Sequence, residues 1–198
     1  MNDPCAWHPE EAGVDEAGRG PLAGPVVIAA VCLCEGFDIA GLDDSKALTA
    51  AQRELQAARI QEACECAVVV IDVEHIDRRN IFWATMDGMA EALRRVRCRR
   101  AAIDGNRVPD DVPVPSRFMI KGDATHPAIA AASILAKVER DRLMTLADAT
   151  YPGYGFARHK GYSCPEHFTA LRELGPCAIH RRSFSPVKEM LEQPVLFA

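Results

Sequence analysis

Two adjacent acids, Asp15 and Glu16, stand directly before a short glycine turn, Gly18-Arg19-Gly20. An apolar approach precedes them and a long apolar run follows, which is typical of a strand edge that carries two carboxylates. Gly18 and Gly20 lack a Cβ, so the N–H groups of the turn can approach a ligand closely, and Arg19 adds a fixed positive charge. Carboxylates beside such an anion-sized cradle are electrostatically consistent only if a cation lies between them. Taken alone, the pair is more often an ordinary acidic turn.

Two further acids follow predicted strands. Asp104 closes the short strand 101–104, and Asp123 follows the strand 117–120 after Lys121-Gly122. Turns that contain glycine can bring acids from strand ends to one edge of a sheet, and four oxygen donors suit a hard cation such as Mg²⁺ or Mn²⁺. Repulsion among four carboxylates is costly unless a metal neutralises it. Singly, Asp104 is equally typical of a turn and Asp123 of a helix cap.

The elements that must position these acids alternate between strand and helix patterns. We predict further strands over 26–33 and 67–73, and helices over about 49–62, 81–97, 127–149 and 165–174. The run 26–33 is apolar on both faces, like a central strand, and Thr49 is a predicted N-cap. Residues 153–161 are predicted to form a loop. The fold class is α/β, with strands predominating early and helices late.

Length and composition set modest bounds. A chain of 198 residues with 48% hydrophobic and 26% charged residues is typical of one compact soluble domain. No apolar stretch approaches the length of a membrane span, and no signal peptide is recognisable, so we expect a cytoplasmic protein without a membrane partner. The eight cysteines form no C-x-x-C pair. Buried, reduced thiols are therefore expected rather than a zinc site or disulfides.

The net charge of −5 hides an uneven distribution. Residues 1–93 hold 6 Lys/Arg against 17 Asp/Glu, whereas residues 94–198 hold 17 against 11. Basic residues cluster at 94–100, 158–160 and 180–182. One basic face opposite an acidic site would suit a polyanion bound through its backbone. The cluster at 94–100 could equally be the solvated end of a helix.

Together these blocks resemble bacterial ribonuclease HII, the type 2 ribonuclease H, from about residue 12 to about residue 189. The matching blocks are DEAGRGPLAGPV at 15–26, LDDSK at 42–46, IDGN at 103–106, KGD at 121–123 with AASILAKV at 131–138, YGF at 154–156 with HKGY at 159–162, and HRRSF at 180–184. Type 3 enzymes carry a long N-terminal extension, whereas only 14 residues precede Asp15 here. The type 2 class is therefore the better match.

The resemblance implies a ribonuclease H-like core with a central mixed β-sheet flanked by helices, and a small helical C-terminal lobe over about 163–189. Residues 12–189 would form the catalytic domain, residues 1–11 a flexible N-terminus and residues 190–198 a tail, which could instead dock a sliding clamp. The implied activity is cleavage of the RNA strand of RNA·DNA hybrids, and nicking 5′ of single ribonucleotides in duplex DNA. We expect a monomer that serves ribonucleotide removal, DNA repair and RNA primer removal.

The resemblance also implies roles for single residues. Its metal-binding and catalytic carboxylates fall on Asp15, Glu16, Asp104 and Asp123, which would hold two Mg²⁺ or Mn²⁺ ions during hydrolysis. The loop that recognises the ribonucleotide 2′-hydroxyl falls on Gly18, Arg19 and Gly20, and the tyrosine that stacks on the sugar at the RNA-to-DNA junction falls on Tyr162. Weaker candidates for substrate phosphate contacts are Ser45, Lys46 and Lys121, although a loop lysine is often simply solvated.

Some assignments stay open. Lys137 could face either the site or solvent. A two-metal mechanism needs no histidine base, so His159 and His180 are expected to be structural or to face the substrate. A noncatalytic hybrid-binding module is the main alternative function, but it would not require four intact carboxylates. A Mg²⁺-dependent phosphotransferase is a third hypothesis, weakened because the chain lacks a G-x-x-x-x-G-K-[ST] loop.

Overall fold

One mixed sheet forms the centre of the computed structural model, which describes residues 8, 10–43 and 45–192. Within these residues its strand order is β3-β2-β1-β4-β5. The strands are β1 (Glu11–Ala17), β2 (Val26–Cys32), β3 (Glu65–Ile71), β4 (Arg100–Asp104) and β5 (Ser116–Met119). The β1–β2 and β2–β3 pairs are antiparallel, whereas β1–β4 and β4–β5 are parallel. The predicted α/β class with a central mixed sheet is confirmed.

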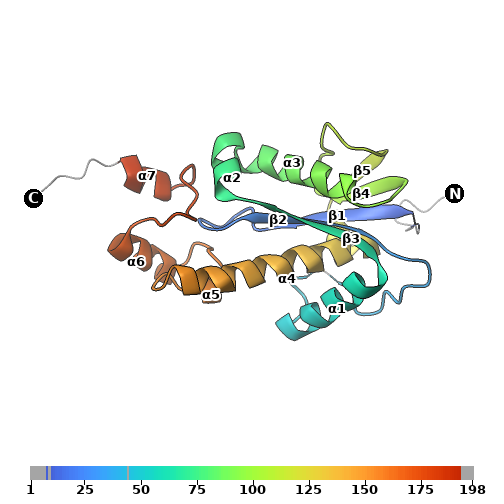
Figure 1. Cartoon of the computed structure of the whole chain (residues 1–198), viewed down its shortest axis with the longest axis horizontal. Coiled ribbons are helices and arrows are strands. Elements are labelled where there is room, and N and C mark those ends of the chain that lie inside the picture. Colours follow the sequence, from blue (N-terminus) through green and yellow to red (C-terminus); the bar gives the residue numbers. More distant parts are fainter. Residues whose placement is uncertain (1–7, 9, 44, 193–198) are drawn as a thin grey trace, which may run out of the picture.

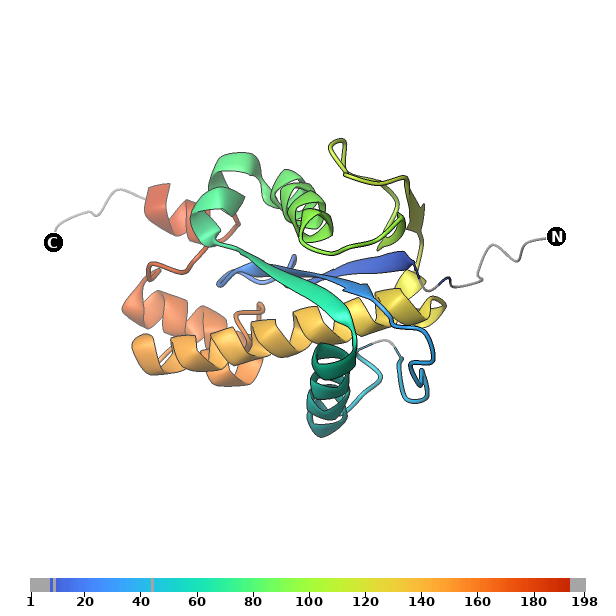
Figure 2. The same cartoon turned by 45° about the vertical axis from the view of Figure 1, so that its right-hand side comes forward.

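Helices cover both faces of this sheet (Figure 1). They are α1 (Ala50–Ala63), α2 (Val73–Arg79), α3 (Ile81–Arg94), α4 (Pro127–Thr150), α5 (Phe156–His159), α6 (Pro165–Leu174) and α7 (Val187–Glu192), with a 3₁₀ turn η1 (Gly122–Ala124) before α4. Helices α2 and α3 lie on one face and α4 with α1 on the other, as the turned view in Figure 2 also shows. The long helix α4 crosses most of the sheet, so it can reach both the strands and the C-terminal helices.

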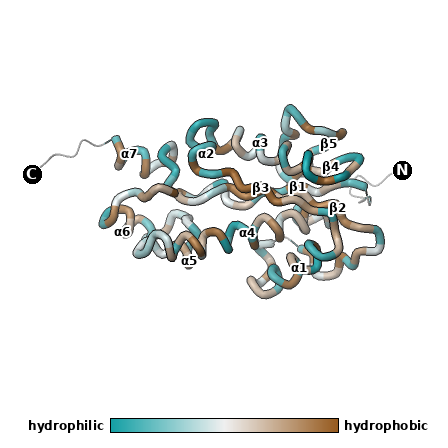
Figure 3. The backbone as a smooth tube through the Cα atoms, viewed as in Figure 1, coloured by the Kyte–Doolittle hydropathy of each residue, from teal (hydrophilic) through white to brown (hydrophobic). Residues whose placement is uncertain are grey.

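The two helical layers explain why β2 is buried at every position. Its side chains alternate between a core shared with α3 and a core shared with α1 and α4. Figure 3 shows the resulting apolar band along the central strands. Helix α4 packs closely on β1 at Gly13, where a Cβ would lie 2.0 Å from the carbonyl carbon of Ala128. A run of buried alanines in α4 permits the same close approach to the sheet.

Helices α5, α6 and α7 lie beyond one end of the sheet, around the far end of α4 (Figure 1). Ala23, Met144, Tyr154, Phe156 and Ala170 form a small separate core there. Helices α6 and α7 fall within the range predicted for a helical C-terminal lobe. Treating this lobe and the sheet as parts of one catalytic domain stays a prediction.

Local signals predicted several boundaries correctly. Thr49 caps α1, and it forms a capping box with Gln52 as its sequence position indicates. The strand predicted over 67–73 is shifted to 65–71, because the side chain of Asp72 caps α2 by accepting from the N–H of His75. The helix predicted to reach residue 97 ends at Arg94.

Other boundaries differ from the predictions at the chain ends and in one loop. The predicted loop 153–161 contains α5, and α7 was not predicted. Glu11 already belongs to β1, and residues 190–192 belong to α7, so the prediction of a flexible N-terminus and of a tail is wrong at these residues. The remaining parts of those predictions, residues 1–7, 9 and 193–198, lie outside the described residues, as does the suggested clamp-docking segment.

No helix in the described part of the chain is both long and apolar enough to cross a bilayer. All seven cysteines that the structure describes are free; Cys32 and Cys64 are buried, whereas Cys34 is exposed. Burial raises the pKa of Cys32 and Cys64 to about 11, so both thiols are protonated at neutral pH. The expectation of buried, reduced thiols therefore fits these two residues but is wrong for Cys34.

Candidate active site

The sheet topology brings the four predicted acids to the same end of the molecule. Asp15 and Glu16 lie near the C-terminal end of strand β1. In the neighbouring parallel strand β4, Ile103 pairs with Val14 of β1. Asp104 therefore lies beside Asp15 where both strands end. Asp123 lies in η1, and the N–H of the preceding Gly122 donates to Asp104 Oδ1 at 2.7 Å.

The acids interact electrostatically. Burial raises the pKa of Asp15 well above its usual range, and the charges of Glu16 and Asp104 raise it further. Burial also raises the pKa of Glu16, where Arg19 opposes and Asp104 adds to the effect. For Asp104 the causes are burial and then the charge of Asp123, opposed by the hydrogen bond from Gly122. Each charge is therefore unfavourable beside the others without a cation.

The donor set fits a hard divalent cation, because all four groups offer oxygen and each is destabilised by its neighbours. The described residues contain no group of three His, Cys, Asp or Glu side chains already arranged to hold a metal ion. Instead, Lys46 Nζ lies 3.6 Å from Asp123 Oδ2 and supplies a positive charge to the cluster.

A serine pair supports Asp15 from α4. The Ser133 hydroxyl hydrogen-bonds Asp15 and lowers its pKa, against the larger effect of burial. Ser133 Oγ is also 2.8 Å from Ser45 Oγ, and both side chains are buried. The predicted phosphate contact of Ser45 stays a prediction, but its hydroxyl already orients Ser133. Sequence reasoning missed Ser133, whose signal was a hydroxyl in an otherwise alanine-rich helix.

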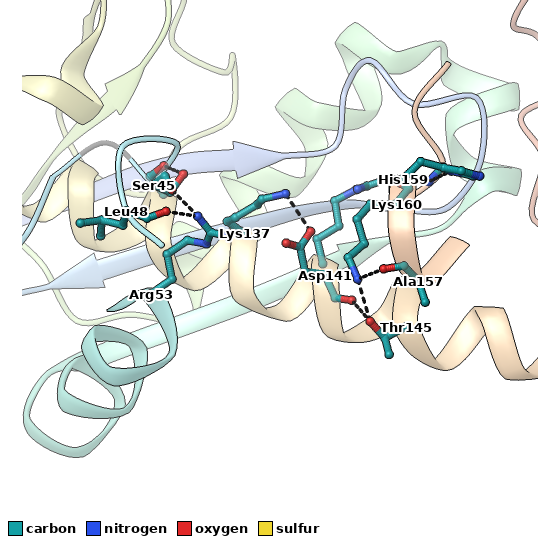
Figure 4. A network of polar contacts seen from close by, with 12 residues as sticks. Ser45, Leu48, Arg53, Lys137, Asp141, Thr145, Ala157, His159 and Lys160 are labelled. Atoms are coloured by element: carbon teal, nitrogen blue, oxygen red, sulfur yellow. Dashed lines mark hydrogen bonds and ion pairs between the residues drawn. The ribbon is translucent and has the colours of Figure 1, made fainter. Parts of the chain in front are cut away.

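The loop that carries Ser45 and Lys46 is anchored to α1. Arg53 Nη1 donates to the carbonyls of Ser45 at 2.8 Å and Leu48 at 2.5 Å (Figure 4). The same view shows Lys137, whose Nζ donates to Asp141 at 2.8 Å along α4. Lys137 was considered to face either the site or solvent. In the structure its ammonium instead forms an ion pair with Asp141 on the same helix.

The two remaining predicted contacts flank this cluster. Lys121 is exposed and has a left-handed backbone, with φ of 56°, at the start of η1. Gly18 also has a positive φ, of 100°, which favours glycine. The exposed Arg19 reaches back to Glu16, with Nη1 3.4 Å from Oε1. The glycine loop and the carboxylates are therefore direct neighbours.

Tyr162 lies beside the glycine loop. Its side chain is 44% exposed, and a Cβ placed on Gly20 would lie 3.8 Å from Tyr162 Cε1. The segment before it is fixed to α4, because Lys160 Nζ donates to Thr145 at 2.8 Å and to the Ala157 carbonyl at 2.7 Å (Figure 4). The exposed ring can therefore contact a ligand without unfolding its surroundings.

A chain of hydrogen bonds supports Tyr162 from inside. His167 Nδ1 donates to the Tyr162 carbonyl at 2.9 Å, so His167 Nε2 accepts from His180 Nε2 at 3.0 Å. The N–H of Cys177 then donates to His180 Nδ1 at 2.9 Å. Burial, followed by the neighbouring His167, lowers the pKa of His180 to about 4. Of the two roles considered for His180, the structure favours the structural one. His159 is structural in the same sense, since its Nε2 donates to the Tyr154 carbonyl at 2.8 Å.

The predicted basic clusters differ in character. Arg94 and Arg95 end α3 and pair with Glu91, which matches the solvated helix end considered for them. The prediction that 180–182 is an exposed basic cluster is wrong for His180 and Arg181, which are both buried. Arg181 and Arg140 instead lie behind the glycine loop. Neither was predicted as a site residue, because a local run of basic residues resembles a surface.

Comparisons with known proteins agree on one relationship. A family model described as Ribonuclease HII matches residues 12–187. A ribonuclease HII of Halorhodospira halophila (strain DSM 244 / SL1) is 55% identical over 184 residues, covering 90% of this chain and 93% of that one. One of Xanthomonas oryzae pv. oryzae (strain KACC10331 / KXO85) is 56% identical over 189 residues, covering 91% and 73%.

Two solved structures are similar over nearly their whole length. The ribonuclease H2 from Pyrococcus horikoshii OT3 aligns with a TM-score of 0.77 and 27% identity, covering 90% of this chain and 95% of that one. A chain from the PCNA:RNase HII complex of Archaeoglobus fulgidus gives 0.77 and 28%, covering 93% and 98%.

Proposed function

Because the chain belongs to the ribonuclease HII family, a family of endonucleases that act on RNA–DNA hybrids, we propose that it also nicks duplex DNA on the 5′ side of a single embedded ribonucleotide. The resemblance recognised in the sequence and the ribonuclease H-like fold are both confirmed. Water is the proposed nucleophile, so the products would carry 5′-phosphate and 3′-hydroxyl ends. The proposed cellular roles are ribonucleotide removal, DNA repair and removal of RNA primers.

The observation that carries this proposal is the convergence of acids from β1, β4 and η1 beside a glycine loop, where the pKa values of Asp15, Glu16 and Asp104 are raised by burial and by neighbouring carboxylates. Asp15, Glu16, Asp104 and Asp123 would hold two Mg²⁺ or Mn²⁺ ions, which when bound would acidify a water molecule and neutralise charge on the phosphate. Ser133 would keep Asp15 oriented toward the site. A noncatalytic hybrid-binding module would have no use for this repulsive cluster.

The neighbouring residues would select and hold the substrate. Lys46, exposed over most of its side chain, would exchange its contact with Asp123 for a substrate phosphate. The N–H groups of the glycine loop would read the 2′-hydroxyl, which distinguishes RNA from DNA without reading any base. The exposed ring of Tyr162 would stack against the sugar at the junction. Ser45 and Lys121 would add phosphate contacts.

Three further assignments concern the oligomeric state, the localisation and a protein partner. We propose that the protein acts as a monomer in the cytoplasm. The Archaeoglobus fulgidus relative was solved as a complex with PCNA. By analogy, a sliding clamp is a proposed partner of this chain, with the docking segment in residues 193–197.

The test uses an end-labelled DNA duplex that contains one ribonucleotide, with an all-DNA duplex as control. Wild type, Asp104→Asn and Asp111→Asn are incubated with Mg²⁺, Mn²⁺ or EDTA. Asp111 is a matched control because its side chain is 92% exposed on the loop between β4 and β5 and pairs with Arg94. We expect metal-dependent nicking 5′ of the ribonucleotide by wild type and Asp111→Asn, and none by Asp104→Asn. Binding without cleavage under every metal would instead favour the noncatalytic module.

A further inference from the structure

Two arginines, Arg140 of α4 and Arg181 after α6, are fully buried directly behind the segment that contains the glycine loop. Within the described residues, their hydrogen bonds go to backbone carbonyls. A buried guanidinium usually lies opposite a carboxylate, because an uncompensated charge is expensive in a protein interior. Here the partners are peptide carbonyls of residues 18–25 and of Lys160, and Arg140 Nη1 has no hydrogen-bond partner among the described residues.

Arg181 bridges the two ends of that loop with one planar group. Its Nη2 donates to the Gly18 carbonyl at 2.5 Å and its Nη1 to the Arg19 carbonyl at 2.8 Å. On the other side, Nε donates to the Gly24 carbonyl at 3.0 Å and Nη2 to the Pro25 carbonyl at 3.2 Å. A lysine, with its donors on a single nitrogen, could not span all four oxygens.

Arg140 couples the same loop to the segment that carries Tyr162. Its Nε donates to the Pro25 carbonyl at 3.1 Å, and its Nη2 donates to the carbonyls of Ala23 at 3.3 Å and Lys160 at 3.0 Å. Its guanidinium carbon lies 5.5 Å from the centre of the Tyr162 ring. A Cβ on Gly18 would lie only 1.9 Å from Arg140 Nε, so the arginine occupies the space that glycine leaves.

The orientation of the carbonyls fixes the orientation of the N–H groups. In a planar trans peptide the C=O and N–H bonds point in opposite directions. Since Arg181 holds the carbonyls of Gly18 and Arg19, the N–H groups of Arg19 and Gly20 point away from it. Neither N–H takes part in a hydrogen bond within the described part of the chain. Both donors are thus presented on the opposite side of the loop.

The burial of these two like charges is electrostatically unfavourable. Burial, followed by the charge of Arg140, lowers the pKa of Arg181 to about 9, which still leaves it charged at neutral pH. Two like charges buried side by side are commonly less stable than apolar residues of similar volume. Their geometric role therefore offers a better reason for their presence than the stability they add.

We propose that Arg181 and Arg140 are positioning residues for recognition of the 2′-hydroxyl, and that they hold the glycine loop and Tyr162 in fixed positions relative to each other. The inference rests on the proposed function, since it names the side chains that give the loop its selectivity. Loss of the hydrogen bonds made by either arginine would let the backbone N–H groups of Arg19 and Gly20 reorient. Selectivity for ribonucleotides would then fall before the ability to cut phosphodiesters is lost.

The test compares two duplexes, one with a single ribonucleotide and one with a 2′-fluoro nucleotide at the same place, in which fluorine, a much weaker acceptor, replaces the 2′-oxygen that would accept from the loop N–H groups. Single-turnover nicking rates with Mg²⁺ are measured for wild type, Arg181→Lys, Arg140→Lys and the control Arg142→Lys. Arg142 is exposed on the same helix and pairs with Glu139. Circular dichroism melts for every variant establish that each is folded at the assay temperature.

We expect the ratio of the two rates to fall by about tenfold in Arg181→Lys and Arg140→Lys, which corresponds to one hydrogen bond of ordinary strength. Most of the loss should fall on the ribonucleotide substrate, and Arg142→Lys should keep the wild-type ratio. Folded variants with an unchanged ratio, or with equal losses on both substrates, would overturn the inference. If wild type itself nicked neither duplex, the proposed function would fail and the inference with it.

A measurement on wild type covers the case in which the lysine variants do not fold. Guanidinium groups held by several carbonyls should give slowly exchanging side-chain N–H signals in ¹⁵N NMR spectra. Two such sets are expected, and their shifts should change on addition of the ribonucleotide duplex but not of the all-DNA duplex. Guanidinium signals that exchange rapidly in the free protein would overturn the inference without any variant.

Discussion

Replacing His180 by glutamine should flatten the pH dependence of folding stability. His180 is buried at 2% exposure and lies between Cys177 and His167, which accepts its Nε2–H. A glutamine amide can still donate to His167, but it does not titrate. The substitution therefore removes the proton equilibrium and keeps the polar contact that leads to Tyr162.

The magnitude follows from the pKa values. In the unfolded chain His180 takes up its proton near pH 6.5, whereas in the native protein it does so only near pH 4. Below pH 6.5 the unfolded state therefore binds more protons, and stability falls as the pH falls. At about 1.36 kcal/mol per pKa unit, the full loss below pH 4 would be about 3 kcal/mol. About 2 kcal/mol of it should already be lost at pH 5.

The assay is urea unfolding followed by circular dichroism at pH 7.5, 6.0 and 5.0. Other groups also titrate in this range, so the informative quantity is a difference between proteins. From pH 7.5 to 5.0, the free energy of unfolding of wild type should fall by about 2 kcal/mol more than that of His180→Gln. His8→Gln, which replaces an exposed histidine, should follow wild type.

Equal pH slopes for wild type and His180→Gln would refute this reasoning, because they would mean that His180 takes up its proton equally well in both states. If His180→Gln were less stable than wild type by the same amount at all three pH values, the difference would reflect only altered packing. The decisive observation is the change in slope between neutral and mildly acidic solution.

Three further predictions concern packing and substrate contacts. Gly13→Ala should cost more than about 3 kcal/mol in urea unfolding, because the new Cβ would lie 2.0 Å from the backbone of Ala128; a wild-type midpoint would contradict it. Lys46→Met should lower the melting temperature by only a few degrees, since the lysine side chain is 79% exposed although its partner Asp123 is largely buried, and it should reduce the slope of log affinity against log salt by about one; an unchanged slope would exclude a phosphate contact. Tyr162→Ala should lower the nicking rate at a single ribonucleotide by about tenfold or more, and Tyr162→Phe should retain it if the ring acts by stacking.

Features set by neighbouring residues could be predicted from the sequence. The strand β2 is buried on both faces because its residues are apolar without interruption, and α6 begins at Pro165 as its proline indicates. The segment after β3 was mistaken for more strand, because Asp72 acts as a helix cap only once the chain turns there. Boundaries of this kind depend on a single hydrogen bond.

The acidic residues of the candidate site could be predicted from the sequence, whereas the residues that position them could not. Asp15, Asp104 and Asp123 each follow a recognisable strand or turn signal, although their meeting point depends on the parallel pairing of β1 with β4. Ser133 and Arg181 acquire their roles only through contacts with residues more than eighty positions away. Nothing in the local sequence distinguishes Arg181 from its exposed neighbour Arg182.

The bond between Arg181 and Gly18 joins residues 163 positions apart, which has a consequence for protein synthesis. A nascent chain emerges from its N-terminus, so the acids and the glycine loop are made long before the side chain that fixes the loop. A fragment that ends before Arg181 would contain all four carboxylates and lack the side chain that holds the carbonyls of Gly18 and Arg19. If the glycine loop selects RNA as proposed, this selectivity would therefore be completed only when translation is almost finished.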